Sequence, residues 1–178
     1  MQFIIERDLL IEALGRVNGT VERRATIPIL TNVFIDARAR DISLRTTDLD
    51  IEVTVPCPAE VQAQGVTTVN AEVFANIVRK CAPGSQLSVT HSTIDPLRIV
   101  CGRAKYQLPT LPADDFPQLS GGSDGVTFEM TTTELRALFE ATRFAISTDE
   151  TRYYLNGIYL HADGEQLVAV ATDGHVLS

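Results

Sequence analysis

The sequence repeats itself at a constant offset of 125 residues, and this repeat restricts the folds open to the chain. The matched apolar positions are Phe3 with Phe128, Leu30 with Leu155, Val33 with Ile158 and Ile35 with Leu160. The polar pair Thr47-Asp48 matches Thr172-Asp173 at the same offset. A constant offset over roughly 45 positions indicates a modular architecture. The second copy should extend as far as the first, so we expect that about seventy residues of it are absent and that the chain is a fragment.

The first copy itself reads as two similar units. Its hydrophobic periodicity predicts a strand at residues 2–6, a helix at 7–17, and strands at 29–36, 42–46 and 51–55. The same order follows with a strand at 66–69, a helix at 71–81, and strands at 87–91, 97–101 and 105–108. This pattern predicts an α+β fold of repeated β-α-β-β-β units, with helices on one face of antiparallel sheets.

A third unit follows a stretch rich in glycine and serine at residues 120–125. We expect a strand at 126–130, a helix at 132–144 and strands at 154–161 and 167–172. The inward face of this helix is expected to carry Leu135, Leu138, Phe139 and Thr142. The sequence therefore predicts a first domain at 1–120, a linker at 121–125, and the first, incomplete unit of a second domain at 126–178.

The charge balance is acidic, with 15 Lys and Arg against 23 Asp and Glu, a net charge of −8. This excludes a protein that holds nucleic acid by bulk positive charge. The predicted helices nevertheless carry basic side chains on their outer faces, namely Arg7, Arg16, Arg79, Lys80, Arg136 and Arg143. Two interpretations stay open: an ordinary solvated helix face, or a mildly positive surface that tolerates phosphates without gripping them.

Sequence motifs of catalysis, metal binding and membrane targeting are missing. Cys57, Cys81 and Cys101 form no Cys-x-x-Cys pair, so we expect reduced, buried thiols and no metal site. The chain has no phosphate-binding glycine loop, no nucleophile elbow, no signal peptide and no apolar run of membrane-spanning length. We therefore expect a cytoplasmic protein without a cofactor. Asp173-Gly174-His175 is read as a tight hairpin turn, and a small acid–base enzyme using Asp173 and His175 is the alternative.

Three stretches in this order resemble the bacterial sliding clamp family, the beta subunit of DNA polymerase III. They are residues 26–32 (TIPILTN), 108–117 (LPTLPADDFP), and 152–157 (RYYLNG) with 171–175 (ATDGH). The resemblance covers the whole chain and corresponds to the first clamp domain plus about half of the second. It implies a processivity factor, not an enzyme, that encircles duplex DNA as a head-to-tail homodimeric ring with helices lining the hole. Without further domains this fragment is not expected to close a ring.

The resemblance also implies contact residues. DNA contacts carry over to Arg24, Tyr153 and Tyr154, while the family position that is often Gln is Asp149 here. A pocket for short hydrophobic peptides carries over to Arg152, Leu155, Thr172, Gly174, His175 and Leu177. The often basic neighbouring position is Val176. The peptides implied belong to the replicative polymerase, the clamp loader, other polymerases and repair proteins.

The subunit contact implied by the resemblance is carried over to Phe74, Ile77, Arg103, Lys105, Tyr106 and Leu108. Basic side chains on an edge strand would deter wrong strand pairing and steer an acidic partner toward this face. A plain protein-interaction module without a DNA role remains the other alternative.

Overall fold

The computed structural model describes residues 1–21, 26–92, 95–119, 128–164 and 166–178. The chain divides into two compact units, unit 1 at Met1–Gly121 and unit 2 at Gly122–Ser178. Both combine helices with antiparallel sheets, which confirms the predicted α+β class. The predicted linker at 121–125 lies outside the described residues. None of the described helices is long and apolar enough to cross a membrane.

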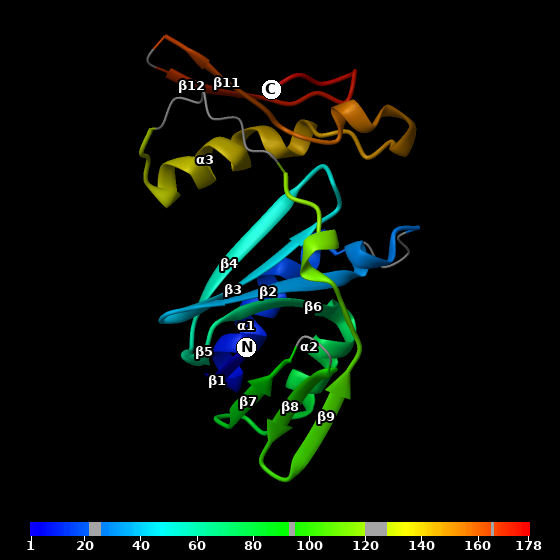
Figure 1. Ribbon diagram of the computed structural model, residues 1–178. Coiled ribbons are helices and arrows are strands. Elements are labelled where there is room, and N and C mark those ends of the chain that lie inside the picture. Colours follow the sequence, from blue (N-terminus) through cyan, green and yellow to red (C-terminus); the bar gives the residue numbers. More distant parts are fainter. Residues whose placement is uncertain (22–25, 93–94, 120–127, 165) are drawn as a thin grey trace. The chain divides into compact units, whose positions relative to one another are not determined.

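Unit 1 contains two five-stranded antiparallel sheets (Figure 1). The first has the order β5-β1-β7-β8-β9, and the second has the order β10-β6-β2-β3-β4. The strands of the first sheet are β1 (Gln2–Glu6), β5 (Glu60–Ala63), β7 (Gln86–Thr90), β8 (Leu97–Cys101) and β9 (Ala104–Leu108). Those of the second are β2 (Asn32–Arg38), β3 (Asp41–Thr47), β4 (Glu52–Pro58), β6 (Gly65–Asn70) and β10 (Thr110–Leu111).

Unit 1 contains the first two predicted β-α-β-β-β repeats, and these repeats exchange their first strands. β1, which begins the first repeat, pairs with β7 of the second repeat, and β6, which begins the second repeat, pairs with β2 of the first repeat. The two repeats therefore do not form separate sheets. Each sheet contains strands from both repeats, so the two repeats fold together as unit 1.

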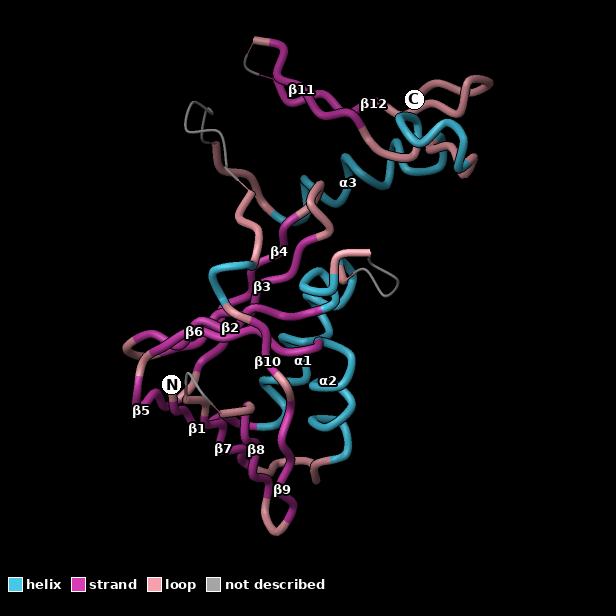
Figure 2. The backbone as a smooth tube through the Cα atoms, turned by 45° about the vertical axis from the view of Figure 1, so that its right-hand side comes forward, coloured by secondary structure: helices cyan, strands magenta, loops and turns pink. Residues whose placement is uncertain are grey.

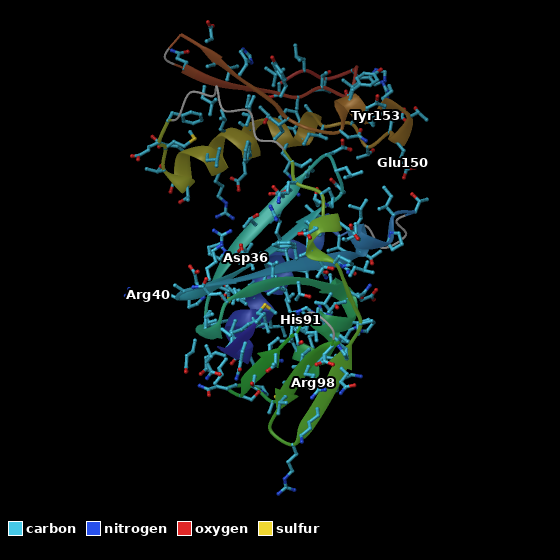
Figure 3. The ribbon with its side chains drawn as sticks, in the orientation of Figure 1. Asp36, Arg40, His91, Arg98, Glu150 and Tyr153 are labelled. Atoms are coloured by element: carbon cyan, nitrogen blue, oxygen red, sulfur yellow. The ribbon has the colours of Figure 1, made fainter. Side chains whose placement is uncertain are left out.

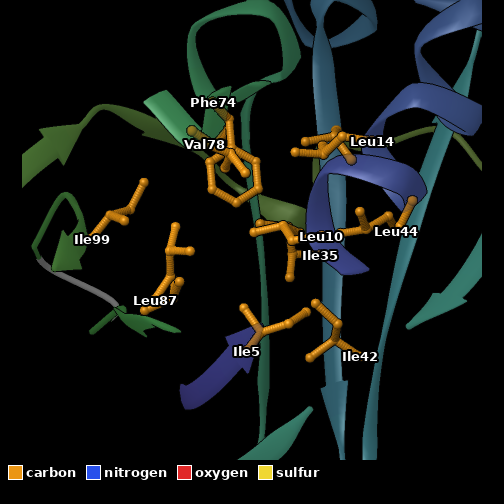
Figure 4. Packing of buried hydrophobic residues seen from close by; sticks show 14 of the residues in the cluster. Ile5, Leu10, Leu14, Ile35, Ile42, Leu44, Phe74, Val78, Leu87 and Ile99 are labelled. Atoms are coloured by element: carbon orange, nitrogen blue, oxygen red, sulfur yellow. The ribbon is translucent and has the colours of Figure 1, made fainter. Parts of the chain in front are cut away.

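Two helices pack side by side against these sheets (Figure 2), α1 (Arg7–Val17) and α2 (Ala71–Lys80). The inward face of α1 consists of Leu10, Ala13, Leu14 and Val17, which recur at helical spacing. α2 begins where the Asn70 side chain accepts a hydrogen bond from the Val73 amide at 3.0 Å, the usual role of Asn before a helix. Figure 4 shows Leu10 and Phe74 in one core with Ile35, Leu87 and Ile99 from both sheets.

The edge strands of unit 1 differ in character. β4 carries Pro56 and Pro58, which cannot donate to a further strand and so discourage unwanted pairing. β9 closes the other sheet and exposes Lys105 at its edge. β5, with polar residues at exposed positions, was missed by the sequence prediction. Short 3-10 turns complete the unit: η1 (Asn18–Thr20), η2 (Pro28–Thr31) and η3 (Ala113–Asp115).

Unit 2 contains helix α3 (Thr132–Thr142), the 3-10 segments η4 (Arg143–Ala145) and η5 (Glu150–Leu155), and a hairpin of β11 (Tyr159–Asp163) with β12 (Gln166–Val170). A capping box between Thr131 and Glu134 starts α3. Thr142 is buried, whereas Leu135, Leu138 and Phe139 are half-buried. The predicted strand at 126–130 is not found at residues 128–130, and 126–127 lie outside the described residues. The predicted strand at 154–161 begins only at Tyr159.

Candidate functional site

A Thr-Asp turn closes the C-terminal end of unit 2. The Asp173 carboxylate accepts hydrogen bonds from the amides of His175 and Val176, both at 2.8 Å. The Thr172 hydroxyl accepts from the Gly174 amide at 3.1 Å and donates to the Val176 carbonyl at 2.6 Å. A bridge between Thr172 and Leu177 closes the hairpin, which confirms the predicted turn.

The matching turn in unit 1 repeats the hydrogen bonds from backbone amides to the Thr and Asp side chains. The Asp48 carboxylate accepts from the amides two and three residues further along, at 3.0 and 2.7 Å, and the Thr47 hydroxyl accepts from the Leu49 amide at 3.0 Å. Leu49 has a φ of 83°, close to the 90° of Gly174 at the repeated position. The repeat thus extends to backbone geometry, and unit 1 places a side chain where the left-handed conformation favours glycine.

We predict that Leu49→Gly raises the free energy of unfolding by about 0.5–1 kcal/mol. Releasing the left-handed strain of a non-glycine residue is worth roughly 1–2 kcal/mol, and the added flexibility of the unfolded chain removes part of that gain. Leu49 is 44% exposed, so little packing is lost. Urea unfolding measures the change. Leu49→Ala is the control: it retains a Cβ, so equal stabilisation by both variants would contradict the strain argument.

Gly174 differs from Leu49 because an arginine lies against it. A Cβ at Gly174 would lie 3.1 Å from Nη1 of Arg152, and the same Nη1 donates to the Asp173 carbonyl at 3.1 Å. The repeat equivalent of Arg152 in unit 1 is Ile27. Arg152 and Gly174 therefore occur together as a matched pair in unit 2.

Asp149 fixes the segment that presents Arg152. Its carboxylate accepts from the amide and hydroxyl of Thr151, at 2.9 and 2.7 Å, and from Nε of Arg152 at 3.0 Å. These bonds, those from Thr151 first and that from Arg152 after them, hold the pKa of Asp149 below its ordinary value. They start η5, so the chain forms a 3-10 turn here and not the predicted strand. This role of Asp149 was not predicted, although an Asp before a polar first turn is a recognised helix-start signal.

η5 exposes two adjacent tyrosines (Figure 3). Tyr153 is 77% and Tyr154 70% exposed, and their rings meet edge to face with centroids 5.8 Å apart. Large aromatic surfaces on an arginine-bearing segment are suited to stacking on bases and to contacts with phosphates. Arg24, the third residue expected to contact DNA, lies outside the described residues.

The structure brings part of the expected peptide pocket together. Arg152, Thr172, Gly174 and Leu177 meet through the contacts above. Leu155 is tied to the same region through its carbonyl, which accepts from the Ser147 amide at 3.0 Å. His175 joins the turn through its backbone amide. Leu177 and Val176 are 73% and 45% exposed, so this part of the turn offers apolar surface.

The acid–base alternative finds little support in this geometry. The Asp173 carboxylate is occupied by two amides of its own turn, and these bonds, the one from Val176 first, lower its pKa. A carboxylate that accepts amide hydrogen bonds is a weak base, since its charged form is already stabilised. Within the residues that the structure describes, no cluster of three or more His, Cys, Asp or Glu could hold a metal ion.

The expected subunit-contact residues divide into surface and core. Arg103 and Lys105 are exposed beside or on β9, and Tyr106 is half-buried. Phe74 is fully buried, and Ile77 and Leu108 are 8% and 6% exposed. Phe74 packs inside unit 1, because α2 turns this face toward both sheets. In the described structure its side chain can therefore shape the expected contact face only from within.

Among the basic residues of the helices, Arg7 is engaged in contacts within unit 1. Its guanidinium donates to the Val78 and Arg79 carbonyls at 3.3 and 3.2 Å and pairs with Asp8 at 2.7 Å. It thus ties the start of α1 to the last carbonyls of α2. Arg16 pairs with Glu12 at 2.6 Å and Arg136 with Glu140 at 3.3 Å, both on exposed faces. The basic helix faces are partly neutralised, consistent with a surface that tolerates phosphates weakly.

Comparison with known proteins adds an independent finding. A family model described as the DNA polymerase III beta subunit, N-terminal domain, matches residues 1–120, and one for the central domain matches residues 129–178. The chain is similar to the beta sliding clamp of Caulobacter vibrioides, with 46% identity over 185 residues that cover 100% of this chain and 49% of the relative. The clamp of Pseudomonas aeruginosa is 38% identical over 179 residues, covering 100% and 48%.

Solved structures agree with the sequence relatives. The sliding clamp of Bartonella birtlesii bound to griselimycin superposes with a TM-score of 0.91 at 43% identity, covering 99% of this chain and 48% of that one. The beta subunit of Pseudomonas aeruginosa gives a TM-score of 0.90 at 36% identity, covering 99% and 48%. The chain spans about half the length of the curated relatives that it matches.

Proposed function

Because the chain belongs to the DNA polymerase III beta subunit family, the bacterial sliding clamps, we propose that the full-length protein is the processivity factor of a replicative DNA polymerase. It encircles duplex DNA without reading its sequence and tethers the polymerase to it. In this role the protein catalyses no reaction and works in the cytoplasm, where bacterial chromosomes are copied. The clamp fold, shared over 99% of this chain with solved clamps, carries the proposal.

The acidic net charge is consistent with encirclement. A ring is retained on DNA by topology, so strong phosphate affinity would only slow its movement along the duplex. The net charge of −8 and the pairing of Arg16 and Arg136 with nearby acids leave a weakly attractive surface. Direct contacts are proposed for Arg24, Tyr153 and Tyr154.

The peptide pocket is proposed to lie on the Thr-Asp turn of unit 2. The guanidinium of Arg152 holds the turn, and Leu177 supplies exposed apolar area on it. The other residues proposed for the pocket are Leu155, Thr172, Gly174 and His175. Peptides that dock by a few apolar side chains need such a prearranged surface. The proteins expected to carry such peptides are the replicative polymerase, the clamp loader, other polymerases and repair proteins. The related Bartonella clamp, solved with griselimycin, shows that a clamp of this family can hold a ligand.

Ring closure is proposed to use β9. As an edge strand it has free backbone groups on one side, and Arg103, Lys105 and Tyr106 lie on or next to it. An acidic surface of a second subunit would complement these cations. Ile77 and Leu108, almost buried, support this face.

The experiment that tests the function uses the full-length protein and its clamp loader. The protein is expected to stay on closed circular DNA and to leave when one cut linearises the circle. Release that does not depend on cutting would contradict encirclement. It would favour the alternative of an interaction module without a DNA role.

We also predict that replacing Tyr153 and Tyr154 together by alanine lowers the affinity for a primed single-strand–duplex junction roughly tenfold. Stacking of a base on an aromatic side chain contributes about 1–3 kcal/mol. Fluorescence anisotropy measures the affinity, and retention on closed circles should persist because it is topological. Tyr159→Ala is the matched control, since Tyr159 is 68% exposed but stacks on His161 in β11. An equal loss in the control would refute a specific role of η5.

A further inference from the structure

Two of the three cysteines lie in one corner of unit 1. Cys81 directly follows α2, and Cys101 ends β8. Both thiols are free and buried, 7% and 8% exposed. Ser85 connects them: its hydroxyl lies 3.3 Å from Sγ of Cys101, and its amide and hydroxyl both donate to the carbonyl of Ala82, the residue after Cys81.

The hydrogen bonds direct both thiol protons toward oxygens. Sγ of Cys81 donates to the Ile77 carbonyl at 3.4 Å. The hydroxyl proton of Ser85 is used on the Ala82 carbonyl at 2.6 Å, so the Cys101 thiol donates to the Ser85 oxygen. The Cys101 thiol also affects Cys81: burial first, and then the neighbouring Cys101 thiol, raise the pKa of Cys81 to about 11.

We propose that Cys81 and Cys101 are an oxidisable pair, which a small-molecule disulfide such as oxidised glutathione converts into an intrachain disulfide bond. Cys81 directly follows α2 and Cys101 ends β8, and the hydrogen bonds of Ser85 hold these two chain ends together, which is the proximity that a disulfide bond requires.

The chemistry balances as thiol–disulfide exchange. In the proposed order, Cys101 reacts first: as its thiolate it attacks one sulfur of the small disulfide and displaces one thiolate. Cys81 then loses its proton and attacks the mixed disulfide at the sulfur of Cys101, displacing the second thiolate. The two protons from the cysteines protonate the two thiolates released. The protein is oxidised by two electrons, and one small disulfide is reduced to two thiols.

Cys57 provides the contrast within the same chain. It lies on β4 in the other sheet, is 2% exposed, and its pKa is raised by burial and then by the charge of Glu12. Burial alone therefore does not distinguish the three thiols. What distinguishes Cys81 and Cys101 is that each has the other as neighbour.

The bond would join the end of α2 to β8 at a point two residues before Arg103. This position is next to β9, since Cys101 pairs with Ala104. The pair thus lies beside the edge proposed to contact a second subunit, although the inference does not depend on that proposal. The raised pKa of Cys81 makes the reaction slow, so it responds to sustained oxidation.

Peptide mapping of the full-length protein tests the pair directly. Trypsin places the cysteines on separate peptides, residues 46–79, 81–98 and 99–103. After incubation with oxidised glutathione and alkylation of free thiols, the unreduced map should contain peptide 81–98 linked to 99–103 and alkylated 46–79. A reductant should separate the linked pair.

Three outcomes would overturn the inference: linkage through peptide 46–79, glutathione adducts that never resolve into a link, or unreacted thiols at all three positions. In Cys57→Ser the link should form as before. In Cys81→Ser, Cys101 should stop at the mixed disulfide with glutathione. A change in DNA retention plays no part in these readouts, so failure of the clamp proposal would leave this test intact.

Discussion

Replacing Phe74 by alanine is expected to lower the free energy of unfolding of unit 1 by about 3–5 kcal/mol, the usual cost of truncating a buried aromatic side chain. Phe74 is 0% exposed and packs with side chains of α1 and of both sheets (Figure 4). The loss combines apolar area removed from the core with the cavity that remains. Urea unfolding followed by circular dichroism measures it.

Val73 on the same helix is the matched control for this prediction. It is 44% exposed, so Val73→Ala should change the free energy of unfolding by no more than about 0.5 kcal/mol. If Phe74 acted mainly as a subunit contact, its truncation would weaken association of the full-length protein and leave unit 1 as stable as before. That result would reverse the assignment of Phe74 to the core.

The helices of unit 1 could be predicted from sequence because their evidence is local. The apolar positions of α1 recur at helical spacing, and Leu10, Leu14 and Val17 are buried as expected. Asn70 supplies a capping side chain for α2, and the turns that follow both helices contain glycine. Local periodicity and capping depend only on neighbours within a few residues.

The exchange of β1 and β6 between the two sheets could not be predicted in this way. Strand pairing joins residues far apart in sequence, such as Phe3 with Val89. An alternating strand shows which residues face a core, but the partner of its edge is set by the whole fold. β5 was missed for a related reason: its residues Glu60 and Gln62 are polar, and it forms a strand because β1 provides a free edge.

The backbone conformation of the candidate site could not be predicted from the sequence. Arg152, Tyr153 and Tyr154 have side chains common in strands, yet the Asp149 carboxylate bends them into η5. The strained Leu49 could have been found from the repeat, because its repeat equivalent is Gly174. The full burial of Phe74 could not be predicted, because an amphipathic helix does not reveal which other elements cover its apolar face.

The Gly174→Ala variant of the full-length protein is expected to bind clamp-binding peptides about tenfold more weakly, a change of about 1.4 kcal/mol. The new Cβ would lie 3.1 Å from Nη1 of Arg152 and would have to adopt a φ of 90°. Arg152 would then have to move and lose its bond to the Asp173 carbonyl, which helps to hold the turn. Isothermal titration with a short hydrophobic clamp-binding peptide measures the affinity.

Alanine substitutions at two other glycines of unit 2 serve as controls. They separate the contact with Arg152 from backbone strain as the cause of the weaker binding. Gly157 has open space for a Cβ and no positive φ, so Gly157→Ala should change neither peptide affinity nor stability appreciably. Gly164 has a φ of 60° and open space, so Gly164→Ala should cost stability through backbone strain of roughly 1–2 kcal/mol while peptide affinity persists. If Gly174→Ala bound peptide as tightly as the unaltered protein, the contact between Gly174 and Arg152 would have no part in forming the pocket.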